Sequence, residues 1–492
     1  MQIRNFSDVK SFLFDNVTIK QTVFKNTFWL ALAGGVNKFL KFILFIYVAR
    51  ILGATEYGKF TFALAFIGLL TIFSDLGLSN IITREFAREK EKEKEFSSLL
   101  SLKILLGLGT LVLILIGSFF ITPDPVIQKI IWILALCLLI ENFFGTIFAF
   151  LQARQKMEYQ SFASIFETSV VTGVGLFVLF YFPSVQNLSY SYLFAALVAS
   201  IFVLIFFHFK IQRLSFSRNK TIWKRFLLMS WPMALTGMLG SIYNQGDSVI
   251  MGYFGQITQN GWYEAAYRII GVTLIPMGLI STSFFPVFSK VFKESKERLQ
   301  TVWNYYMEIM ILLAIPLMVG GMVLAPKIID FVFDPSYAPS VLAFQILIIM
   351  VGIMFFYNPF YQVLIISDQQ KRIFWIVLAG AIFDTIFNLL TIPKFSLYGA
   401  AFSTLITHLL IFYLLFKFTL KFTSINPLNL KLLLSFIGAI LSTVPMYFVI
   451  IQPQIYHLHI LFSILIGTLI YSVTFFILRY LSGIFIHSYE KT

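Results

Sequence analysis

The chain has 492 residues, of which 58% are hydrophobic and 12% are charged, and its mean hydropathy is +0.84. So few charges cannot solvate the surface of a water-soluble protein of this size, and apolar runs of roughly 20 residues recur throughout. The formal net charge of +14 does not indicate a nucleic-acid-binding protein, because no gap between the apolar runs is long enough for a soluble basic module. These features predict an all-α polytopic membrane protein.

Hydropathy predicts fourteen membrane-spanning helices after a short N-terminal segment. Residues 1–25 mix basic and aromatic side chains without a continuous apolar core, so we expect an amphipathic lead-in at the interface and not a cleaved signal. The predicted spans are 27–49, 57–82, 97–121, 127–150, 160–182, 190–210, 227–253, 262–288, 301–324, 340–366, 373–392, 398–419, 431–451 and 458–480.

Lysine and arginine are distributed unequally between the two sides of these spans. The N-terminal segment, the C-terminal tail and every second loop hold 28 of the 37, whereas the opposite loops hold five. The positive-inside rule therefore predicts a multi-pass protein of a prokaryotic cytoplasmic (inner) membrane with both termini in the cytoplasm. The positive charge then reflects topology and contact with anionic lipid headgroups, and nucleic acid is not expected as a partner.

Lys38 and Lys41 lie inside the first predicted span, one helical turn apart. At about 1.5 Å rise per residue they are roughly 10–15 Å deep, too deep for their side chains to reach the interface completely. A cation at that depth is costly without compensation, so such residues normally face a water-filled cavity or a fixed partner. The pair predicts a transporter with a cationic interior.

The seventh and eighth spans carry further polar residues. Asn244 and Asp247 share one face of the seventh span, and Glu264 and Arg268 are spaced i, i+4 in the eighth. We expect the two acidic residues to be charge partners or ion-coupling groups. Two static alternatives stay open, in which Arg268 only bridges to Glu264 and Asp247 only neutralises Lys41. The residues predicted to bind substrate are Lys38, Lys41, Arg268 and Asn244.

Other intramembrane polar residues have less defined roles. Glu141 and Glu167 are deeply placed, with no partner assigned from the sequence. Asp384 and Asn388 share a face of the eleventh span, and polar residues that include Thr407 cluster on the twelfth. This second group could form another polar path, but hydrogen bonding between helices is the favoured interpretation.

No residue pattern indicates catalysis or a bound cofactor. Cys137 is the only cysteine, which excludes an intrachain disulfide and a CxxC metal site. No Ser/His/Asp constellation, phosphate-cradling glycine loop or ATP-binding domain is evident. We therefore expect a transporter and not an enzyme, with no catalytic residue, metal site or cofactor, although coupling to H⁺ or Na⁺ stays open.

An internal repeat relates the two halves of the chain. At an offset of 203 residues Gly58 corresponds to Gly261, and both glycines follow a turn between two spans. An even number of spans separates the copies, so they share one orientation and form a parallel repeat about an axis along the membrane normal. The predicted domains are 1–215 and 216–422, with six spans each, and 423–492 with the last two.

Several strings resemble a known family of membrane proteins. They are ARILGATEYGKF (49–60), SDLGL (74–78), ITREFA (82–87), QGDSVIMGYFG (245–255), GWYEAAYRI (261–269) and YGAAFSTLI (398–406). Their order and spacing are similar to those of Wzx-type polysaccharide and O-antigen flippases in the multidrug/oligosaccharidyl-lipid/polysaccharide exporter superfamily. The resemblance covers roughly residues 25–420 and is less specific over the last two spans.

The resemblance implies two six-helix bundles around a central cavity that opens alternately to each side. Its implied activity is outward movement of an oligosaccharide linked to polyprenyl diphosphate, in contact with membrane lipids and with polysaccharide-assembly proteins as candidate partners. An ion-coupled drug or cation antiporter of the same superfamily is the alternative. A membrane glycosyltransferase or polymerase is less favoured, because no DxD motif occurs in an outer loop and the outer connections are short.

Overall fold

The computed structural model describes residues 12–211, 215–427, 429–456 and 458–481, so the first 11 residues of the predicted lead-in lie outside the described residues. All regular elements in the described part are helices, which confirms the predicted fold class. Twelve of them are long and apolar enough to cross a membrane. The chain divides into two compact units, Met1–Gly261 and Trp262–Thr492. The domain bounds predicted after residues 215 and 422 stay predictions.

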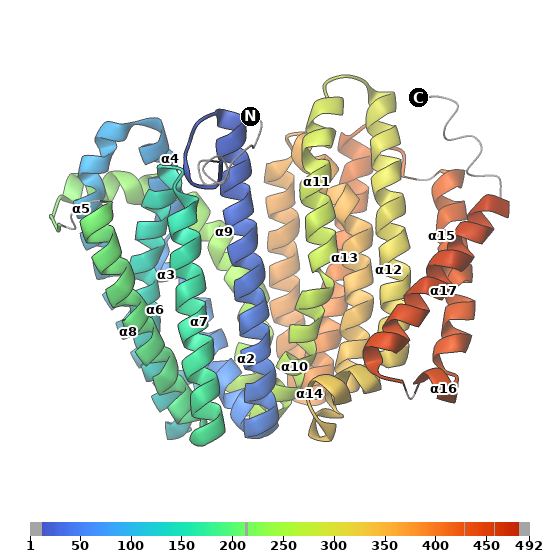
Figure 1. Cartoon of the computed structure of the whole chain (residues 1–492), viewed down its shortest axis with the longest axis horizontal. Coiled ribbons are helices and arrows are strands. Elements are labelled where there is room, and N and C mark those ends of the chain that lie inside the picture. Colours follow the sequence, from blue (N-terminus) through green and yellow to red (C-terminus); the bar gives the residue numbers. More distant parts are fainter. Residues whose placement is uncertain (1–11, 212–214, 428, 457, 482–492) are drawn as a thin grey trace. The chain divides into compact units, whose positions relative to one another are not determined.

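Unit 1 contains five long helices that follow one another after a bent N-terminal hairpin. Within it α5, α6, α7 and α8 run alongside one another (Figure 1). Its elements are α2 (Ile19–Leu70), α3 (Ile72–Asp75), α4 (Leu78–Arg88), the 3₁₀ helix η1 (Lys90–Glu95), α5 (Phe96–Ile121), α6 (Pro125–Ala153), α7 (Met157–Tyr181), α8 (Val185–Lys210) and α9 (Lys220–Tyr253), followed by the first residues of α10 (Ile257–Thr273).

Helix α2 holds the first predicted span and most of the second. Thr18 caps its start by accepting a hydrogen bond from the Gln21 backbone N–H, and Gly53 reverses the chain with φ +75°. The second predicted span, 57–82, is not one straight helix. It breaks after α2 and again at Leu76 and Gly77, where the Gly77 backbone approaches Met233 so closely that an added Cβ would lie 2.7 Å from the Met233 Cβ.

The charged segment at the end of α4 ties several helices of unit 1 together. Glu85 accepts hydrogen bonds from Arg84 Nε at 3.1 Å and Lys92 Nζ at 2.6 Å. Glu93 pairs with Arg154 at the end of α6, and Glu95 pairs with Arg225 near the start of α9. The segment therefore connects the ends of α4, α6 and α9 through ion pairs.

Unit 2 also consists mainly of long helices that run antiparallel to one another. Its elements after α10 are α11 (Ile275–Val291), α12 (Lys296–Val332), the 3₁₀ helix η2 (Pro335–Tyr337), α13 (Ser340–Ile366), α14 (Gln370–Phe422), α15 (Leu430–Ile450), α16 (Pro453–Tyr456) and α17 (Ile460–Leu481).

Two backbone irregularities shape the predicted spans of unit 2. The predicted span 262–288 is divided between α10 and α11. Pro276 lies in the first turn of α11, where a backbone N–H has no partner within the helix, so its missing N–H costs no hydrogen bond. Helix α14 contains the predicted spans 373–392 and 398–419, because the chain reverses at Ser396 with φ +53° and ψ −133°. Each of the fourteen predicted spans thus lies mostly in helix, with 57–82 divided among α2, α3 and α4 and 262–288 divided between α10 and α11.

Two polar contacts attach α15 and α17 to α12. Arg479 Nη1 lies 2.7 Å from Glu308 Oε1, which also accepts a hydrogen bond from Ser435 Oγ at 3.1 Å. At the other end of α12, Lys327 donates to Ser463 Oγ at 2.9 Å and to the backbone carbonyl of Tyr456. The last two predicted spans are therefore bound to unit 2 by charge-assisted bonds at two levels.

The ends of α6 and α13, which hold the fourth spans of the two predicted repeats, agree with the repeat. Helices α6, α9 and α13 all end in the same turn. In this turn the backbone N–H of a residue with positive φ donates to the carbonyl three residues before it, and the next backbone N–H donates to the carbonyl five residues before it. The positive-φ residues are Gln155, Gly255 and Asp368.

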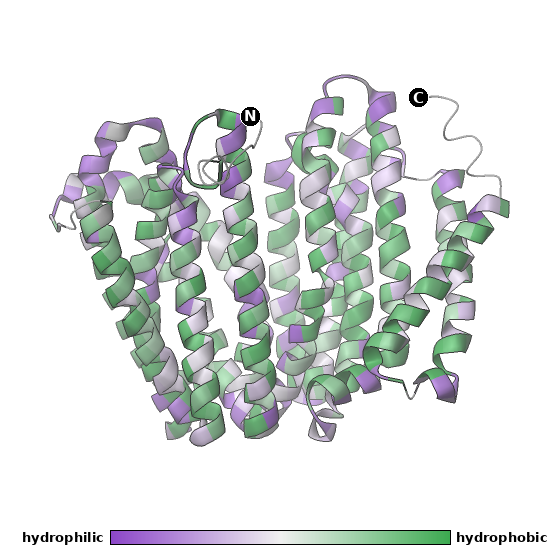
Figure 2. Ribbon diagram, in the orientation of Figure 1, coloured by the Kyte–Doolittle hydropathy of each residue, from purple (hydrophilic) through white to green (hydrophobic). Residues whose placement is uncertain are grey.

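In Figure 2 the middle parts of the helices are predominantly hydrophobic and the polar residues concentrate towards helix ends, as a bilayer requires.

We predict that the ion pair between Lys25 on α2 and Glu158 on α7 stabilises unit 1. Lys25 Nζ lies 2.9 Å from Glu158 Oε2, and the side chains are 0% and 4% exposed. Lys25→Met leaves a buried carboxylate without its cation, which costs about 3–5 kcal/mol. The expected result is a lower midpoint of thermal unfolding in detergent, partly restored by adding Glu158→Gln. Lys59→Met, which removes a pair that is 19% and 36% exposed, is the control and should cost about 0–1 kcal/mol. Equal losses in the two single variants would contradict the prediction.

Candidate functional site

The two predicted substrate-binding lysines lie on the first half of α2. Lys38 and Lys41 are both exposed, whereas Leu44, one turn beyond Lys41, is fully buried. Their i, i+3 spacing places them on neighbouring positions of the helix surface. The helix therefore presents two open cations within a segment whose sequence is apolar enough to span a membrane.

Two carboxylates to which the sequence analysis assigned no partner lie near Lys41. The Lys41 ammonium is near enough to Glu141 on α6 and Glu167 on α7 for its charge to act on both carboxylates, without an ion pair within 4.0 Å between them in the described part of the chain. Beside them, Asn37 Nδ2 donates to Ser164 Oγ at 2.6 Å and joins α2 to α7. We call these five residues the Lys41 cluster. The sequence signal was the placement of two glutamates inside apolar spans, but nothing in it indicated that they would share a lysine.

The composition of the Lys41 cluster changes what it can do chemically. With all groups ionised, one lysine faces two carboxylates, so the cluster is not purely cationic. An arriving phosphate would compete with Glu141 and Glu167 for the Lys41 ammonium. A carboxylate released in this way would attract a proton or a small cation, since an isolated charge in a membrane interior is costly. The cluster thus combines groups for an anionic ligand with groups for a counter-ion.

The predicted polar residues of α9 differ in exposure. Asn244 is exposed, and its Nδ2 donates to the Gly240 carbonyl of the preceding turn at 2.8 Å. Asp247, three residues later, is buried at 8% exposure. Helix α9 packs against α2 inside unit 1. Asn244 is therefore available to a ligand, whereas Asp247 has the environment of a structural or coupling group.

The third predicted group lies in unit 2, on α10. Arg268 Nη2 lies 3.4 Å from Glu264 Oε2, so the i, i+4 bridge considered from the sequence is present. The Arg268 side chain remains 36% exposed while Glu264 is 9% exposed. Tyr267, next to this pair, stacks on Tyr263 with ring centroids 5.8 Å apart. The bridge therefore helps to hold Arg268 in place, and its side chain is only partly buried.

A second polar group of unit 2 forms hydrogen bonds between helices, as the sequence analysis favoured. Asp384 and Thr407 lie on the two arms of the α14 hairpin, and Thr407 Oγ1 donates to Asp384 Oδ1 at 3.0 Å. Asn388 Nδ2 donates to Asp384 Oδ2 at 3.0 Å. Asp384 and Asn388 are 4% and 0% exposed. These bonds join the arms of the hairpin.

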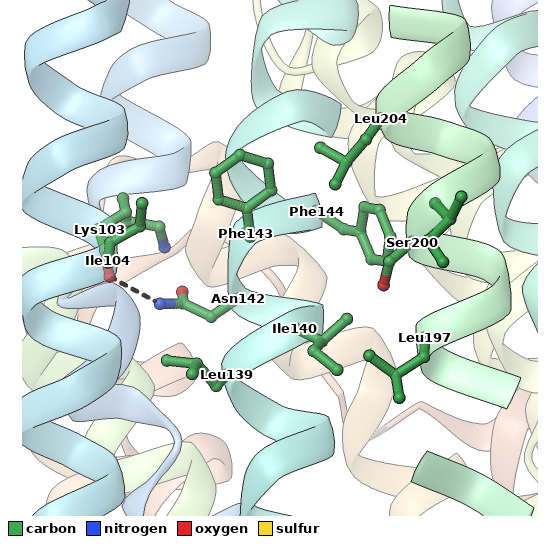
Figure 3. Close-up of a pocket in the computed structure, with 11 residues that line it drawn as sticks. Lys103, Ile104, Leu139, Ile140, Asn142, Phe143, Phe144, Leu197, Ser200 and Leu204 are labelled. Carbon is green, nitrogen blue, oxygen red and sulfur yellow. Dashed lines mark hydrogen bonds between the residues drawn. The ribbon is translucent and has the colours of Figure 1, made fainter. Parts of the chain in front are cut away.

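A cavity of about 350 Å³ lies between α5, α6 and α8 of unit 1 (Figure 3). Its polar side chains are already bonded within the protein: Lys103 donates to Asp75, and Asn142 Nδ2 donates to the Lys103 carbonyl at 3.1 Å. The remaining lining is almost entirely hydrocarbon, including Phe143 and Leu197. The cavity suits an apolar chain and not a sugar or a diphosphate.

The family of the chain follows from comparison with known proteins. Residues 23–292, more than half of the sequence, match the family described as polysaccharide biosynthesis protein. The chain belongs to this family. The match includes Lys38, Lys41 and the hairpins on either side of both repeat glycines, and it confirms the resemblance identified from the sequence motifs.

Relatives and a solved structure agree with this assignment. The chain is 21% identical to the probable low-salt glycan biosynthesis flippase Agl15 of Haloferax volcanii, over 74% of this chain and 76% of that protein. It is 22% identical to a putative O-antigen transporter of Shigella flexneri, over 68% and 82% respectively. The structure of the lipid II flippase MurJ in an inward closed conformation matches 92% of this chain and 98% of its own, with a TM-score of 0.74 and 16% identity. That likeness shows the polytopic transporter fold.

We predict that Lys38 and Lys41 face water and not lipid. Cys137 is the only cysteine and is buried, so Cys137→Ser provides a background for single cysteines. A hydrophilic methanethiosulfonate reagent reacts with the thiolate, which forms in water and not in hydrocarbon. Cysteines replacing Lys38 and Lys41 should react about tenfold faster than Leu108→Cys, because Leu108 belongs to an exposed apolar stripe on α5. Equally slow reaction at all three positions would place the lysines against acyl chains.

Proposed function

We propose that the protein is a flippase that moves a polyprenyl-diphosphate-linked oligosaccharide from the cytoplasmic to the outer leaflet by alternating access. The observation that carries the proposal is the pair of exposed lysines, Lys38 and Lys41, on a membrane-spanning helix of a polysaccharide biosynthesis family member. Relatives named as a glycan biosynthesis flippase and an O-antigen transporter support the substrate class.

The chemistry of the substrate matches the open polar groups. The diphosphate is anionic and needs cations, the sugars need hydrogen-bond donors and acceptors, and the prenyl chain can stay in bilayer hydrocarbon. Lys38, Lys41 and Arg268 supply the cations, and Asn244 supplies an exposed amide. No bond of the substrate has to break, so the proposal needs no catalytic residue and no resident cofactor.

The direction of transport follows from the charge. With the cytoplasm negative, outward movement of an anion is downhill by about 2.3 kcal/mol per charge per 100 mV. The unequal distribution of basic residues supports cytoplasmic termini in a prokaryotic inner membrane. Enzymes that assemble the glycan on its lipid on one side, and polymerising or ligating enzymes on the other, are the partners this placement suggests.

Return of the empty transporter is the step that ion coupling would serve. Glu141 and Glu167 beside Lys41 favour exchange between the phosphate and a proton or Na⁺, and Asp247 and Glu264 are further acidic groups on α9 and α10. The same carboxylates keep the cation or drug antiporter as the second candidate. The two functions differ in which charge is indispensable, the lysines or the acids.

Reversing the charge of the cations tests the flippase proposal. Hydrogen bonds to charged groups contribute about 1.5–3 kcal/mol, so Lys38→Glu, Lys41→Glu and Arg268→Glu should each lower transport about 10- to 100-fold. The measurement is movement of labelled lipid-linked glycan in proteoliposomes, at matched amounts of folded protein. Lys41→Arg keeps the charge and should retain most of the activity. Full transport by all three Glu variants would overturn the cationic site.

Neutralising the acids distinguishes the two candidates. In the antiporter, Asp247→Asn should abolish proton- or Na⁺-driven cation efflux, since the carboxylate would be the coupling group. In the flippase, Asp247→Asn, Glu141→Gln and Glu167→Gln should permit glycan movement and change its response to an imposed pH or Na⁺ gradient. The measurement is transport with and without each gradient. Cation efflux by the wild type in the absence of glycan transport would favour the antiporter.

A further inference from the structure

A groove of about 400 Å³ lies between α7 and α8 of unit 1, which pack against each other. Val174 and Val178 line it from the end of α7, and Tyr190 and Phe194 line it from the start of α8. The Tyr190 and Phe194 side chains are exposed, so the groove is open along its α8 side. Its volume is within the range of sites that bind small molecules.

The polar side chains of this α7–α8 groove already have hydrogen bonds within the protein. Asn187 Nδ2 donates to the Phe182 carbonyl at 3.1 Å, and Ser191 Oγ donates to the Leu188 carbonyl at 2.7 Å. The rest of the lining is hydrocarbon and aromatic ring, which offers water few hydrogen-bond partners. On a membrane-spanning protein, a hydrocarbon chain is therefore the favoured occupant of the groove.

The α7–α8 groove is confined to one end of the two helices. From Phe182 at the end of α7 it extends to Val174, about 12 Å along the axis at about 1.5 Å rise per residue. The hydrocarbon core of a bilayer is about 30 Å thick, so the groove stays within one leaflet. The distribution of lysine and arginine predicts that this end lies on the outer side.

A cation lies at the edge of the α7–α8 groove. Lys129, near the start of α6, places its Nζ 5.8 Å from the centroid of the Tyr190 ring, within the range of a cation–π contact. The Lys129 side chain is exposed, and no acidic side chain among the described residues forms an ion pair with it. Asp124, which precedes it on the chain, caps α6 by accepting from the Val126 N–H at 2.8 Å. Lys129 therefore presents a positive charge beside an apolar groove.

Lys129 differs from other basic residues predicted on the outer side. Only five lysines and arginines lie in the outer loops. Lys59 is paired with Glu56 at 2.7 Å, and Lys327 donates to Ser463 Oγ at 2.9 Å. Those two cations bond to groups of the protein itself, whereas Lys129 borders the groove. A basic group next to a site for a hydrocarbon chain is the combination that recognises an anionic lipid.

We propose that the α7–α8 groove binds one anionic phospholipid of the outer leaflet. One acyl chain lies against Val174, Val178 and Phe194, and the headgroup phosphate lies at Lys129. A headgroup with net negative charge gains from the ammonium, whereas a zwitterionic headgroup carries its own cation and gains less. The site lies outside the Lys41 cluster and requires no transport, so it is independent of the proposed function.

Photolabelling of the full-length protein locates the lipid. Vesicles of phosphatidylcholine would contain a trace of phosphatidylglycerol with a diazirine in one acyl chain, and labelled peptides would be identified by mass spectrometry. We expect labelling of residues 174–194 to exceed labelling of the exposed apolar surface of α5 about fivefold, because one lysine near an anionic headgroup contributes a factor of about that size. Equal labelling of the two regions would overturn the proposal.

Two charge variants test the role of Lys129. Lys129→Met should lower labelling of residues 174–194 to the level of the α5 surface. Lys394→Met, which removes another exposed lysine of the outer loops, should leave it unchanged. Unlabelled phosphatidylglycerol should suppress the labelling more strongly than phosphatidylethanolamine with the same acyl chains. Full labelling of folded Lys129→Met, or stronger suppression by a polyprenyl diphosphate than by phosphatidylglycerol, would overturn the assignment of an anionic phospholipid.

Filling the groove gives a test that leaves the cation in place. Val178→Phe adds a ring inside the groove and should lower labelling of α8 around Phe194 about fivefold. Val112→Phe makes the same change at an exposed position of α5 that does not line the groove, and it should have no effect on α8. Unchanged labelling of α8 in folded Val178→Phe would show that no acyl chain lies in the groove.

Discussion

Bilayer hydrocarbon offers no hydrogen bonds, and this constraint explains most of the structure. Chain reversals such as those at Gly53 and Ser396 occur at hairpin tips, and the backbone between them is helical almost throughout. Several charged side chains inside the helices are paired with charges on neighbouring helices. The pairs Lys25–Glu158, Lys103–Asp75 and Arg479–Glu308 each join two helices of one unit. In a membrane such pairs determine which helices pack together, because apolar contact with lipid is as favourable as apolar contact with protein.

The exposed lysines of α2 differ from these ion-paired residues, because no acidic side chain forms an ion pair with either of them in the described part of the chain. Lys38 and Lys41 are open, although Lys25 on the same helix is fully buried in its ion pair. The helix therefore changes from a structural role near its start to an open polar face further along. The two glutamates near Lys41 limit the cost of keeping a cation there in the absence of a ligand, and they make its availability dependent on what they bind. Under the proposed function, substrate affinity and ion occupancy would both depend on this one cluster.

The sequence predicted the helices well and their side-chain contacts poorly. The helical character of all fourteen spans follows from hydropathy and the repeat follows from spacing, whereas the break near Pro276 in the span 262–288 was not predicted. The pairing of Arg268 with Glu264 was also accessible, because both lie on one helix. In contrast, the Lys41 cluster combines α2, α6 and α7, and no pattern within a single span specifies which faces of three helices meet. The roles of Glu141 and Glu167 therefore emerged only from the packed structure.

The same limit applies to the repeat glycines. Alignment of the two hairpins matched Gly58 with Gly261, but the contact between them requires that both copies present the same surface to each other. Duplication makes such a contact self-complementary, because a feature that suits one copy is present in the other. The sequence also breaks the symmetry: the counterpart of Asn260 at the same offset is Tyr57, so the amide that bonds Gly58 has no equivalent on the other side. In the structure a Cβ added to either glycine would lie within 2.0 Å of a backbone carbonyl oxygen of the other helix, so a symmetric backbone contact carries an asymmetric hydrogen bond.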